Sequence, residues 1–360
     1  MTFKKIVFSP FAAIYGVVTS IRNALYDWNI LKSKSFDIHT ICVGNLAVGG
    51  TGKTPHVEYL VKLLSPQFKL ALLSRGYKRK TSGFIRAVKN STVFDIGDEP
   101  LQYITKNPEL DVCVDVNRVN GVQQILKFPQ PPQVIILDDA FQHRALNSEL
   151  KIVISDYSNL YIYDSLLPAG TLRESSVGIN RADIIIISKM PYSATSIDIK
   201  HITKDLKPLA HQKIFFSWLK YGELIGFQNH QEIIDTLNDL YRYHILVFTG
   251  IGNPQPMVTY LKEYASEVKH VQYPDHYQFT TNDLAHIKAE FDAIKEENKI
   301  IVTTEKDAMR LMMPDLESIT INLPLYILPI EVDFRDKSQE FNETITDYVR
   351  TNKFHHQKYS

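Results

Sequence analysis

The stretch that decides the fold is Val43-Gly44-Asn45-Leu46-Ala47-Val48-Gly49-Gly50-Thr51-Gly52-Lys53-Thr54, between an apolar run and a helical pattern. Its glycines let backbone N–H groups turn inward around a phosphate, and the helix start adds the positive end of its dipole. Lys53 can then reach the β- and γ-phosphates, and Thr54 can bind Mg²⁺. The strict pattern has Gly where this chain has Ala47, but the rest is complete. We therefore predict that a nucleoside triphosphate binds to Gly49, Gly50, Thr51, Gly52, Lys53 and Thr54.

A carboxylate for the metal is expected at the end of another buried strand. The apolar run Val134–Leu137 leads directly into Asp138 and Asp139. We predict that these acids hold Mg²⁺ together with Thr54, directly or through water. The alternative is that two adjacent acids only cap a loop.

Short Val/Ile/Leu runs alternate with helical patterns in the first half of the chain. Such continuous apolar runs are typical of parallel strands buried on both faces. The helix expected after the glycines has Val57, Leu60, Val61 and Leu64 on one face, with Pro55 in its first turn. We predict a P-loop NTPase-like, doubly wound α/β domain with strands at Ile41–Val43, Leu70–Ser74, Val112–Val114, Val134–Leu137, Ile152–Ser155 and Ile184–Ser188.

The pattern changes after Lys213. Phe215–Phe227 is expected to form two short extended pieces, and Asn229–His244 a polar helix. A second, smaller α/β lobe is expected to follow, with strands at Ile245–Phe248, Val268–Gln272, Ile300–Val302 and Leu325–Leu328 and helices near Pro256–Tyr264, Asn282–Glu296 and Lys337–Val349. The predicted parts are an N-terminal helix (1–35), the nucleotide-binding domain (36–213), a hinge (214–243), the smaller domain (244–350) and a polar tail (351–360).

The N-terminal segment is unusually apolar. No charged residue occurs from Ile6 to Ile21, and this run is shorter than the roughly 20 residues needed to cross a bilayer core. We expect a helix that lies at the membrane interface or anchors the protein there. The alternatives are a helix buried in the protein's own core and a cleaved secretory signal, which lacks a convincing cleavage site here.

Composition excludes some classes of protein. The chain has 360 residues with 40 Lys+Arg and 40 Asp+Glu, so no overall basic charge favours nucleic acid. Cys42 and Cys113 lie far apart in apolar runs, which fits neither a disulfide framework nor a zinc site. We therefore expect a globular protein of a reducing compartment, without a nucleic-acid partner.

Residues beyond the phosphate loop separate a kinase from a hydrolysing switch. A guanine-specific switch carries Asn/Thr-Lys-x-Asp after a late strand, where this chain has Ile187-Ser188-Lys189-Met190. A kinase instead needs a group that accepts the proton of a hydroxyl, with cationic help for the phosphoryl group. Candidates cluster in Ser74-Arg75-Gly76-Tyr77, Gly97-Asp98-Glu99-Pro100, Asp138-Asp139-Ala140-Phe141-Gln142-His143, Pro168-Ala169-Gly170-Thr171-Leu172-Arg173-Glu174, Asp275-His276-Tyr277-Gln278-Phe279 and Thr303-Thr304-Glu305-Lys306-Asp307.

In this order, and with Pro55 after the phosphate loop, these pieces resemble the tetraacyldisaccharide 4′-kinase family over about residues 1–330. One departure is Ala140, where the family usually has Gly. The resemblance implies ATP·Mg²⁺ and transfer of the γ-phosphate to the 4′-hydroxyl of a tetraacyldisaccharide 1-phosphate, a membrane-embedded lipid A precursor. It also implies a peripheral or N-terminally anchored protein at the cytoplasmic face of the bacterial inner membrane.

The resemblance further implies that Asp98 acts as the base, paired with His276, while Lys53 serves the phosphates. Glu99 and Gln142 are candidates for the magnesium shell, although Glu99 could equally be a solvated loop acid. Arg75, Arg118 and Arg173 are candidates for binding phosphate or forming structural ion pairs, and Tyr77 and His143 for the sugar pocket or for packing. Lys306 and Asp307 are candidates to reach the cleft, and the alternative is that the acids of this segment cap a helix.

A different class of function shares the phosphate loop and the magnesium acids. This alternative is a membrane-recruited P-loop ATPase switch that acts on a protein partner. It needs a positioned water but no acceptor pocket, so the Asp98 and His276 motifs and the second lobe favour the kinase.

Overall fold

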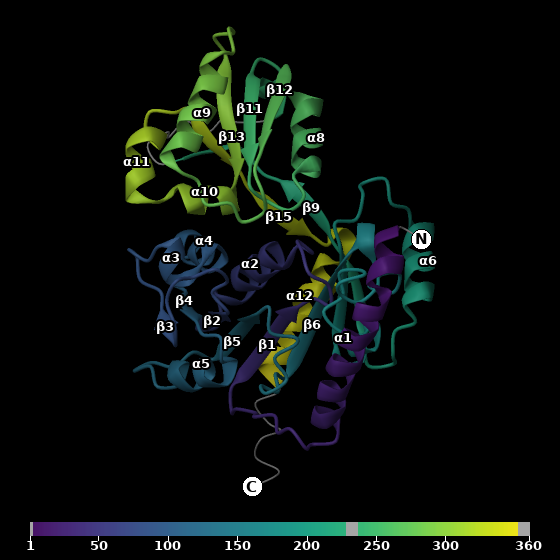
Figure 1. Ribbon diagram of the computed structural model, residues 1–360. Helices are drawn as coiled ribbons and strands as arrows, with labels where there is room; N and C mark the ends of the chain where they lie inside the picture. The colour runs from purple at the N-terminus through teal and green to yellow at the C-terminus, as the bar shows by residue number, and fades with distance from the viewer. Residues whose placement is uncertain (1–2, 228–236, 352–360) are drawn as a thin grey trace.

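The computed structural model describes residues 3–227 and 237–351, which form two α/β lobes, one above the other in Figure 1. The first half of the helix expected at Asn229–His244 and all but one residue of the predicted tail lie outside the described residues. In the described second half the helix covers Leu237–Leu240, and His244 already begins a strand. Three helices run along the outside of this arrangement or at its junction. They are α1 (Phe3–Asp27), α2 (Lys53–Leu64) and α12 (Ser338–Thr351).

The large lobe is built on an eight-stranded sheet with the order β3-β4-β2-β5-β1-β6-β7-β8. Every pairing is parallel except the one between β3 and β4. The six predicted strands are all present, and the sheet confirms the doubly wound prediction. The strands are β1 (His39–Gly44), β2 (Leu70–Ser74), β3 (Ile85–Arg86), β4 (Asp111–Val114), β5 (Val134–Asp138), β6 (Leu150–Asp156), β7 (Ile184–Ser188) and β8 (Lys213–Phe216).

Helices cover both faces of this sheet, which explains why its strands are continuously apolar. Alternate residues of β1 show the division, because Ile41 and Val43 pack with α2 and α12 whereas Cys42 packs with the opposite layer. The remaining helices of the large lobe are α3 (Val93–Ile96), α4 (Asp98–Lys106), α5 (Arg118–Ile125) and α6 (Ser196–Leu206), with short 3-10 turns at Tyr157–Asn159 and Ser176–Arg181.

The small lobe has a five-stranded sheet with the order β10-β14-β13-β11-β12, in which only β10 is antiparallel to its neighbour. Its four predicted strands are present. The elements are β10 (Ile225–Gly226), α7 (Leu237–Leu240), β11 (His244–Thr249), α8 (Gln255–Tyr264), β12 (Glu267–Gln272), α9 (Thr281–Asp292), β13 (Lys299–Thr304), α10 (Glu305–Leu311), α11 (Pro314–Thr320) and β14 (Leu325–Leu328).

The chain passes between the lobes twice, as the antiparallel pair β9 (Trp218–Tyr221) and β15 (Ile330–Asp333). After β15 and a 3-10 turn (Arg335–Lys337), α12 returns to the large lobe, where Phe341 contacts Tyr59 and Phe215. The sequence-based division placed this helix with the small lobe and ended the large lobe at 213. Both boundaries shift, because α12 buries its apolar face on the large lobe and β8 extends the large sheet to Phe216.

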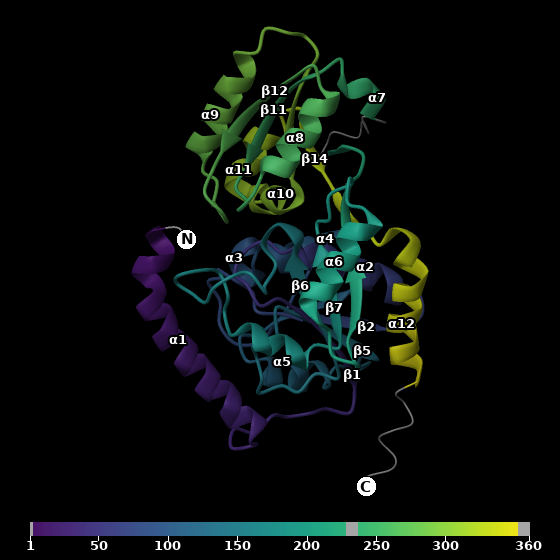
Figure 2. The ribbon, with the colours of Figure 1, turned by 90° about the vertical axis from the view of Figure 1, so that its right-hand side faces the viewer.

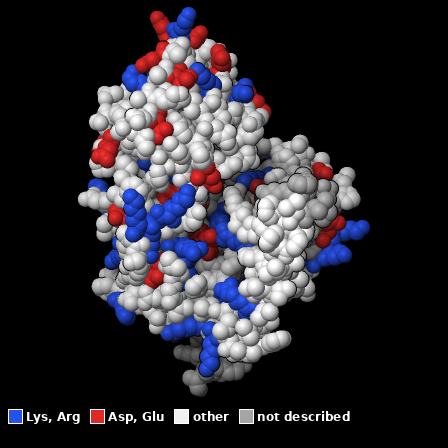
Figure 3. Space-filling model, in the orientation of Figure 1, with Lys and Arg blue, Asp and Glu red and all other residues white. Residues whose placement is uncertain are grey.

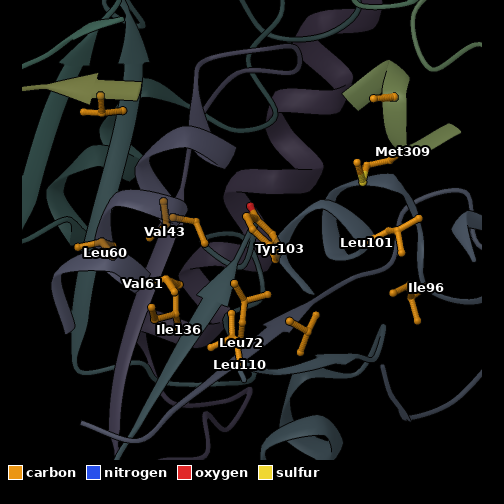
Figure 4. Close-up of a cluster of buried hydrophobic side chains, with 14 of the residues drawn as sticks. Val43, Leu60, Val61, Leu72, Ile96, Leu101, Tyr103, Leu110, Ile136 and Met309 are labelled. Carbon is orange, nitrogen blue, oxygen red and sulfur yellow. The ribbon is translucent and has the colours of Figure 1, made fainter. Parts of the chain in front are cut away.

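The two lobes share apolar contacts as well as the strand pair. Met309 of α10 belongs to the same buried cluster as Ile96 and Leu101 of the large lobe (Figure 4). Helices α4 and α10 thus pack together at the junction of the lobes.

Helix α1 lies along the outside of the large lobe, on the side opposite α12 (Figure 2). One face of this helix is exposed and apolar, so the helix is not buried in the protein's own core, which was one alternative left open by the sequence. The exposed side chains are Val7, Phe8, Phe11, Ile14, Val17, Val18 and Ile21. No helix among the described residues is long and apolar enough to cross a membrane.

His56 ties α2 to the strand pair between the lobes. Its Nδ1–H donates to the carbonyl oxygen of Gly52 (2.7 Å), and its Nε2 accepts from the Ser217 hydroxyl (2.9 Å). Both nitrogens are therefore used by the neutral ring, and burial lowers the pKa of His56 to about 4.

This burial predicts a pH dependence of stability. Between pH values near 6.5 and 4 the unfolded chain binds a proton at His56 that the folded protein excludes. The free energy of unfolding should fall as the pH is lowered through this range, by at most about 3 kcal/mol from this residue. Urea unfolding of wild type and His56→Gln at several pH values tests this, since the variant should lose that part of the slope. Equal slopes would contradict the assignment.

Candidate active site

The glycine-rich turn joins β1 to α2 in the conformation that its sequence requires. Gly49 (φ 107°) and Gly52 (φ 90°) have left-handed backbone, which a side chain would strain. Ala47 does not, so the missing glycine of the strict pattern costs this turn nothing. The Asn45 amide donates to the Thr51 hydroxyl (3.0 Å), which holds the turn from inside.

Lys53, directly after the glycine turn, lies close to the acids at the end of β5, as the sequence predicted. Lys53 Nζ lies 3.5 Å from Asp139 Oδ1, and Arg173 Nη1 donates to both carboxylate oxygens of Asp139 (2.8 and 2.9 Å). Burial alone raises the pKa of Asp139, but the two cations outweigh it and hold that pKa below its usual value. Arg173 therefore forms an ion pair with Asp139, which is one of the two roles that the sequence suggested for it.

Asp138 is in a different environment, although it is the adjacent residue. It is 1% exposed; Ser74 Oγ donates to its Oδ2 (3.1 Å), while its Oδ1 has no hydrogen-bond partner. Burial, followed by the nearby charges of Glu99 and Asp139, raises the pKa of Asp138 to about 7. A buried carboxylate with an unsatisfied oxygen and acidic neighbours is a place where a cation is favourable.

Glu99 brings a residue of the small lobe to the phosphate loop. Its Oε1 accepts from Thr54 Oγ1 (3.2 Å) and from Lys306 Nζ of α10 (2.5 Å). The Lys306 ammonium thus lies at the same carboxylate oxygen as the threonine of the glycine turn. Glu99 is therefore not a solvated loop acid, and Lys306 reaches the cleft.

Asp98 and His276 meet across the two lobes. His276 Nδ1 donates to Asp98 Oδ2 at 2.8 Å, and the Asp98 side chain is largely buried. Burial raises the pKa of Asp98, but the His276 hydrogen bond and the charges of Arg310 and Lys306 outweigh this effect. The pKa of Asp98 is therefore well below its usual value, and the carboxyl group is ionised. Asp98 Oδ1 accepts only from the Glu99 backbone N–H (3.0 Å) among the described residues, which leaves acceptor capacity.

Arg310, a fully buried residue of α10, lies beside this pair and was not predicted from the sequence. Its guanidinium donates to Asp98 Oδ2 (2.5 and 3.2 Å), to Asp307 Oδ1 (2.8 Å) and to the Gly250 carbonyl (2.8 Å). Thr304 caps α10 by accepting the Asp307 N–H (3.1 Å), and its hydroxyl donates to Asp307 Oδ2 (2.7 Å). The Asp307 carboxylate is thereby held in the first turn, where it binds Arg310. The sequence feature that could have indicated a buried arginine is its position as the single charged residue in the apolar run Ala308–Met312.

Three of the residues predicted to bind substrate gather beside the acids. These residues are Arg75, Arg118 and His143. Burial, and then the positive charges of Arg118, Arg22 and Arg75, lower the pKa of His143 to about 4, so Arg22 of α1 belongs to the same region. Arg118 is buried and donates to the carbonyls of Asp138 (3.2 Å) and Asp139 (3.4 Å), while its Nε has no partner. Arg75 is exposed. These cations form a basic region at the edge of the site.

Tyr77 and Gln142 are in defined positions. The Tyr77 ring is half exposed and packs edge-on against His276, with ring centroids 5.2 Å apart. The Gln142 amide nitrogen donates to the Asn45 carbonyl (2.8 Å) and to Glu174 Oε1 (3.0 Å), so it braces the glycine turn. The left-handed backbone conformation occurs at Asp139 (φ 48°) and not at Ala140. The methyl group of Ala140 is therefore tolerated where the family usually has Gly.

Comparison with known proteins identifies the family. A family model described as tetraacyldisaccharide-1-P 4′-kinase matches residues 4–350. The chain belongs to the tetraacyldisaccharide-1-P 4′-kinase family. It is 45% identical over 352 residues to a tetraacyldisaccharide 4′-kinase of Bacteroides thetaiotaomicron, with 95% of this chain and 93% of the relative covered. A tetraacyldisaccharide 4′-kinase of Flavobacterium johnsoniae is 43% identical over 350 residues, with 97% and 98% covered.

A solved structure of the tetraacyldisaccharide 4′-kinase family supports the same conclusion. The crystal structure of LpxK from Aquifex aeolicus in complex with ATP matches with a TM-score of 0.74 and 28% identity, over 96% of this chain and 99% of that one. The P-loop NTPase-like fold and the kinase class are thereby established. The switch alternative has no support from these relatives.

The Arg310 contacts predict a large loss of stability when the guanidinium is removed. Arg310→Met would leave Asp98 and Asp307 as buried carboxylates without their main cation, at a cost of about 3–5 kcal/mol. Chemical denaturation measures the change. Arg350→Met, which removes an exposed arginine from α12, is the matched control and should change stability by less than about 1 kcal/mol. Similar values for the two variants would contradict the role given to Arg310.

Proposed function

We propose that this protein transfers the γ-phosphate of ATP to the 4′-hydroxyl of a tetraacyldisaccharide 1-phosphate at the cytoplasmic face of a bacterial inner membrane. The observation that carries this assignment is the Asp98–His276 hydrogen bond at the junction of the lobes, beside the carboxylates that face Lys53. A hydrolytic switch has no need for an acceptor-activating pair shared between two lobes, whereas a kinase does.

The residues around Asp138 fit a magnesium ion. Asp138 Oδ1 is buried without a partner, and Glu99 and Asp139 add negative charge beside it. No three His, Cys, Asp or Glu side chains in residues 3–227 and 237–351 form a metal cluster by themselves, which agrees with the preference of Mg²⁺ for waters and phosphate oxygens. Thr54, Asp138 and Glu99 would hold the ion, with Asp139 nearby, while the Gln142 carbonyl oxygen remains a further candidate. Bound Mg²⁺ would neutralise charge on the β- and γ-phosphates.

Lys53 and the glycine turn would hold the phosphates of ATP. The backbone N–H groups of residues 49–54 and the start of α2 favour negative charge, and Lys53 already faces Asp139 rather than solvent. Lys306 would add a cation from the small lobe next to Glu99. The lobes together would then exclude water from the phosphoryl group.

Asp98 would accept the hydrogen bond of the sugar hydroxyl through its remaining acceptor capacity. His276 and Arg310 hold its other oxygen, so the carboxylate has one orientation. A carboxylate with a lowered pKa is a weak base, but phosphoryl transfer through a loose transition state requires positioning of the nucleophile more than early removal of its proton. The His276 imidazole then stabilises the charge of the pair as the proton leaves.

The basic region supports binding of a second anionic group, which would be the phosphate already on the acceptor. Arg75 is exposed, the Arg118 Nε is buried without a partner, and His143 lies among these cations. Figure 3 shows Lys and Arg lining the surface beside the nearly uncharged strip over α1. Tyr77, packed on His276, would lie against the sugar.

The exposed face of α1 supports contact with the membrane surface. Its apolar side chains recur every three or four residues from Val7 to Ile21, so they form one continuous stripe on the helix. Such a helix can lie at the interface with its apolar face in the acyl region. An acceptor with several acyl chains leaves a bilayer only at about 0.8 kcal/mol per CH₂ group, which favours an enzyme that works at the surface.

A phosphoryl-transfer assay with labelled ATP tests the proposal. Wild type should move the γ-label into an extractable glycolipid, and Asp98→Asn should lower kcat by about 100-fold or more while the Kd for ATP changes little. Asp95→Asn, in the short helix α3, is the control: its carboxylate bonds locally to Thr92, and the variant should keep its kcat. Label released as free phosphate regardless of added lipid would favour an ATPase switch instead.

The pKa of Asp138 predicts how magnesium dependence varies with pH. Metal binding requires the ionised carboxylate, and without metal this group binds a proton below a pH of about 7. The Mg²⁺ concentration for half-maximal activity should therefore fall as the pH rises from about 6 to 8. Titrations of Mg²⁺ at several pH values measure this, and Asp138→Asn should need much more Mg²⁺ at every pH. A requirement independent of pH would exclude Asp138 as the titrating ligand.

A further inference from the structure

The face of α1 that is turned toward the large lobe differs from its exposed apolar face. Ala12 is buried, and a Cβ added at Gly16 would lie 2.7 Å from Leu166, so the helix approaches the loop 164–172 closely. Tyr15, Thr19 and Asn23 continue this inner face at helical spacing and are all partly buried. A membrane anchor needs only the outer stripe, so these inner contacts call for another explanation.

Two side chains of the inner face bind one short segment, Thr171–Glu174, which we call the strap. The Tyr15 hydroxyl donates to the Arg173 carbonyl oxygen (2.7 Å), and the Asn23 amide donates to Glu174 Oε2 (2.8 Å). Glu174 is itself buried and accepts from Gln142 and Arg181 at its other oxygen. Both contacts are directional hydrogen bonds between groups more than 150 residues apart in sequence.

The strap is also bonded to the glycine turn through the backbone. The Arg173 N–H donates to the Leu46 carbonyl (2.7 Å), and the Val48 N–H donates to the Thr171 carbonyl (2.8 Å). The Arg173 guanidinium holds both oxygens of Asp139, which in turn faces Lys53. An unbroken series of hydrogen bonds and ion pairs therefore connects α1 to the phosphate-binding residues.

We infer that α1 is a positioning element of the active site: Tyr15 and Asn23 hold the strap so that Arg173 and the glycine turn keep their places beside Asp139. The helix thus has two separate functions, one on each face. Binding of this helix to a membrane would also affect the position of the strap, because the outer stripe and the inner hydrogen bonds belong to the same 25-residue helix. This inference rests on the proposed function for the reaction that it assists, but its contacts stand independently of the substrate.

The test compares three full-length variants. Tyr15→Phe removes only the hydroxyl that reaches Arg173, and Asn23→Ala removes only the amide that reaches Glu174. Thr19→Ala is the matched control, because its hydroxyl donates within α1, to the carbonyls of Tyr15 and Gly16. Each variant leaves the apolar stripe intact. The measurements are kcat and KM for ATP and lipid, sedimentation with phospholipid vesicles, and amide hydrogen exchange.

Tyr15→Phe and Asn23→Ala should lower kcat by about 5- to 10-fold, with KM for the lipid and vesicle binding within about twofold of wild type. The amides of Val48 and Arg173 should exchange faster with solvent in both variants and not in Thr19→Ala. A purely anchoring helix predicts the reverse pattern, in which these variants keep kcat and amide protection.

Failure of the inference differs from failure of the proposed function. Unchanged kcat and unchanged exchange at Val48 and Arg173 in both variants would overturn the inference. If wild type itself transfers no phosphate to the lipid, the proposed function fails, while the exchange measurement still decides the inference without any substrate. Loss of kcat accompanied by an equal loss of vesicle binding would also overturn it.

Discussion

The constraint on which the rest of the molecule depends is the crowding of buried negative charge at one edge of the large sheet. Asp98, Glu99, Asp138 and Asp139 gather there, and burial alone raises the pKa of each of them. Buried carboxylates are tolerated only when cations or hydrogen bonds compensate them. A carboxylate whose charge is balanced by neighbouring cations is ionised. Asp138 lacks such a balance, so its surroundings favour an added cation.

The compensating cations come from three separate parts of the chain, and this arrangement holds the lobes together. Lys53 follows the glycine turn and Arg173 belongs to the strap, whereas Lys306 and Arg310 belong to α10 of the small lobe. The ion pairs of Lys306 with Glu99 and of Arg310 with Asp98 thus join the lobes and also hold two carboxylates of the site. The apolar contacts between α4 and α10 add non-directional stability, and the ion pairs add directional contacts between the lobes.

Much of the fold and the centre of the site followed from the sequence, because local patterns encode them. The apolar strands, the glycine turn and the acids after β5 are adjacent in sequence to the elements that position them. The division into lobes was less accurate, since α12 has an ordinary amphipathic pattern that does not say which lobe it covers. Arg310 was missed because its partners Asp98 and Gly250 are distant in sequence, and periodicity carries no information about such pairs.

The sequence by itself determined the doubly wound fold, the glycine turn between β1 and α2 and the acidic and basic side chains available near it, because each depends on residue type and short-range spacing. Only the tertiary structure decided which cation compensates which carboxylate, that Lys306 reaches Glu99, and that the inner face of α1 bonds to the strap. The reason is physical: pairing of charges and hydrogen-bonding groups depends on distances of a few ångströms between segments that the chain brings together only when it folds.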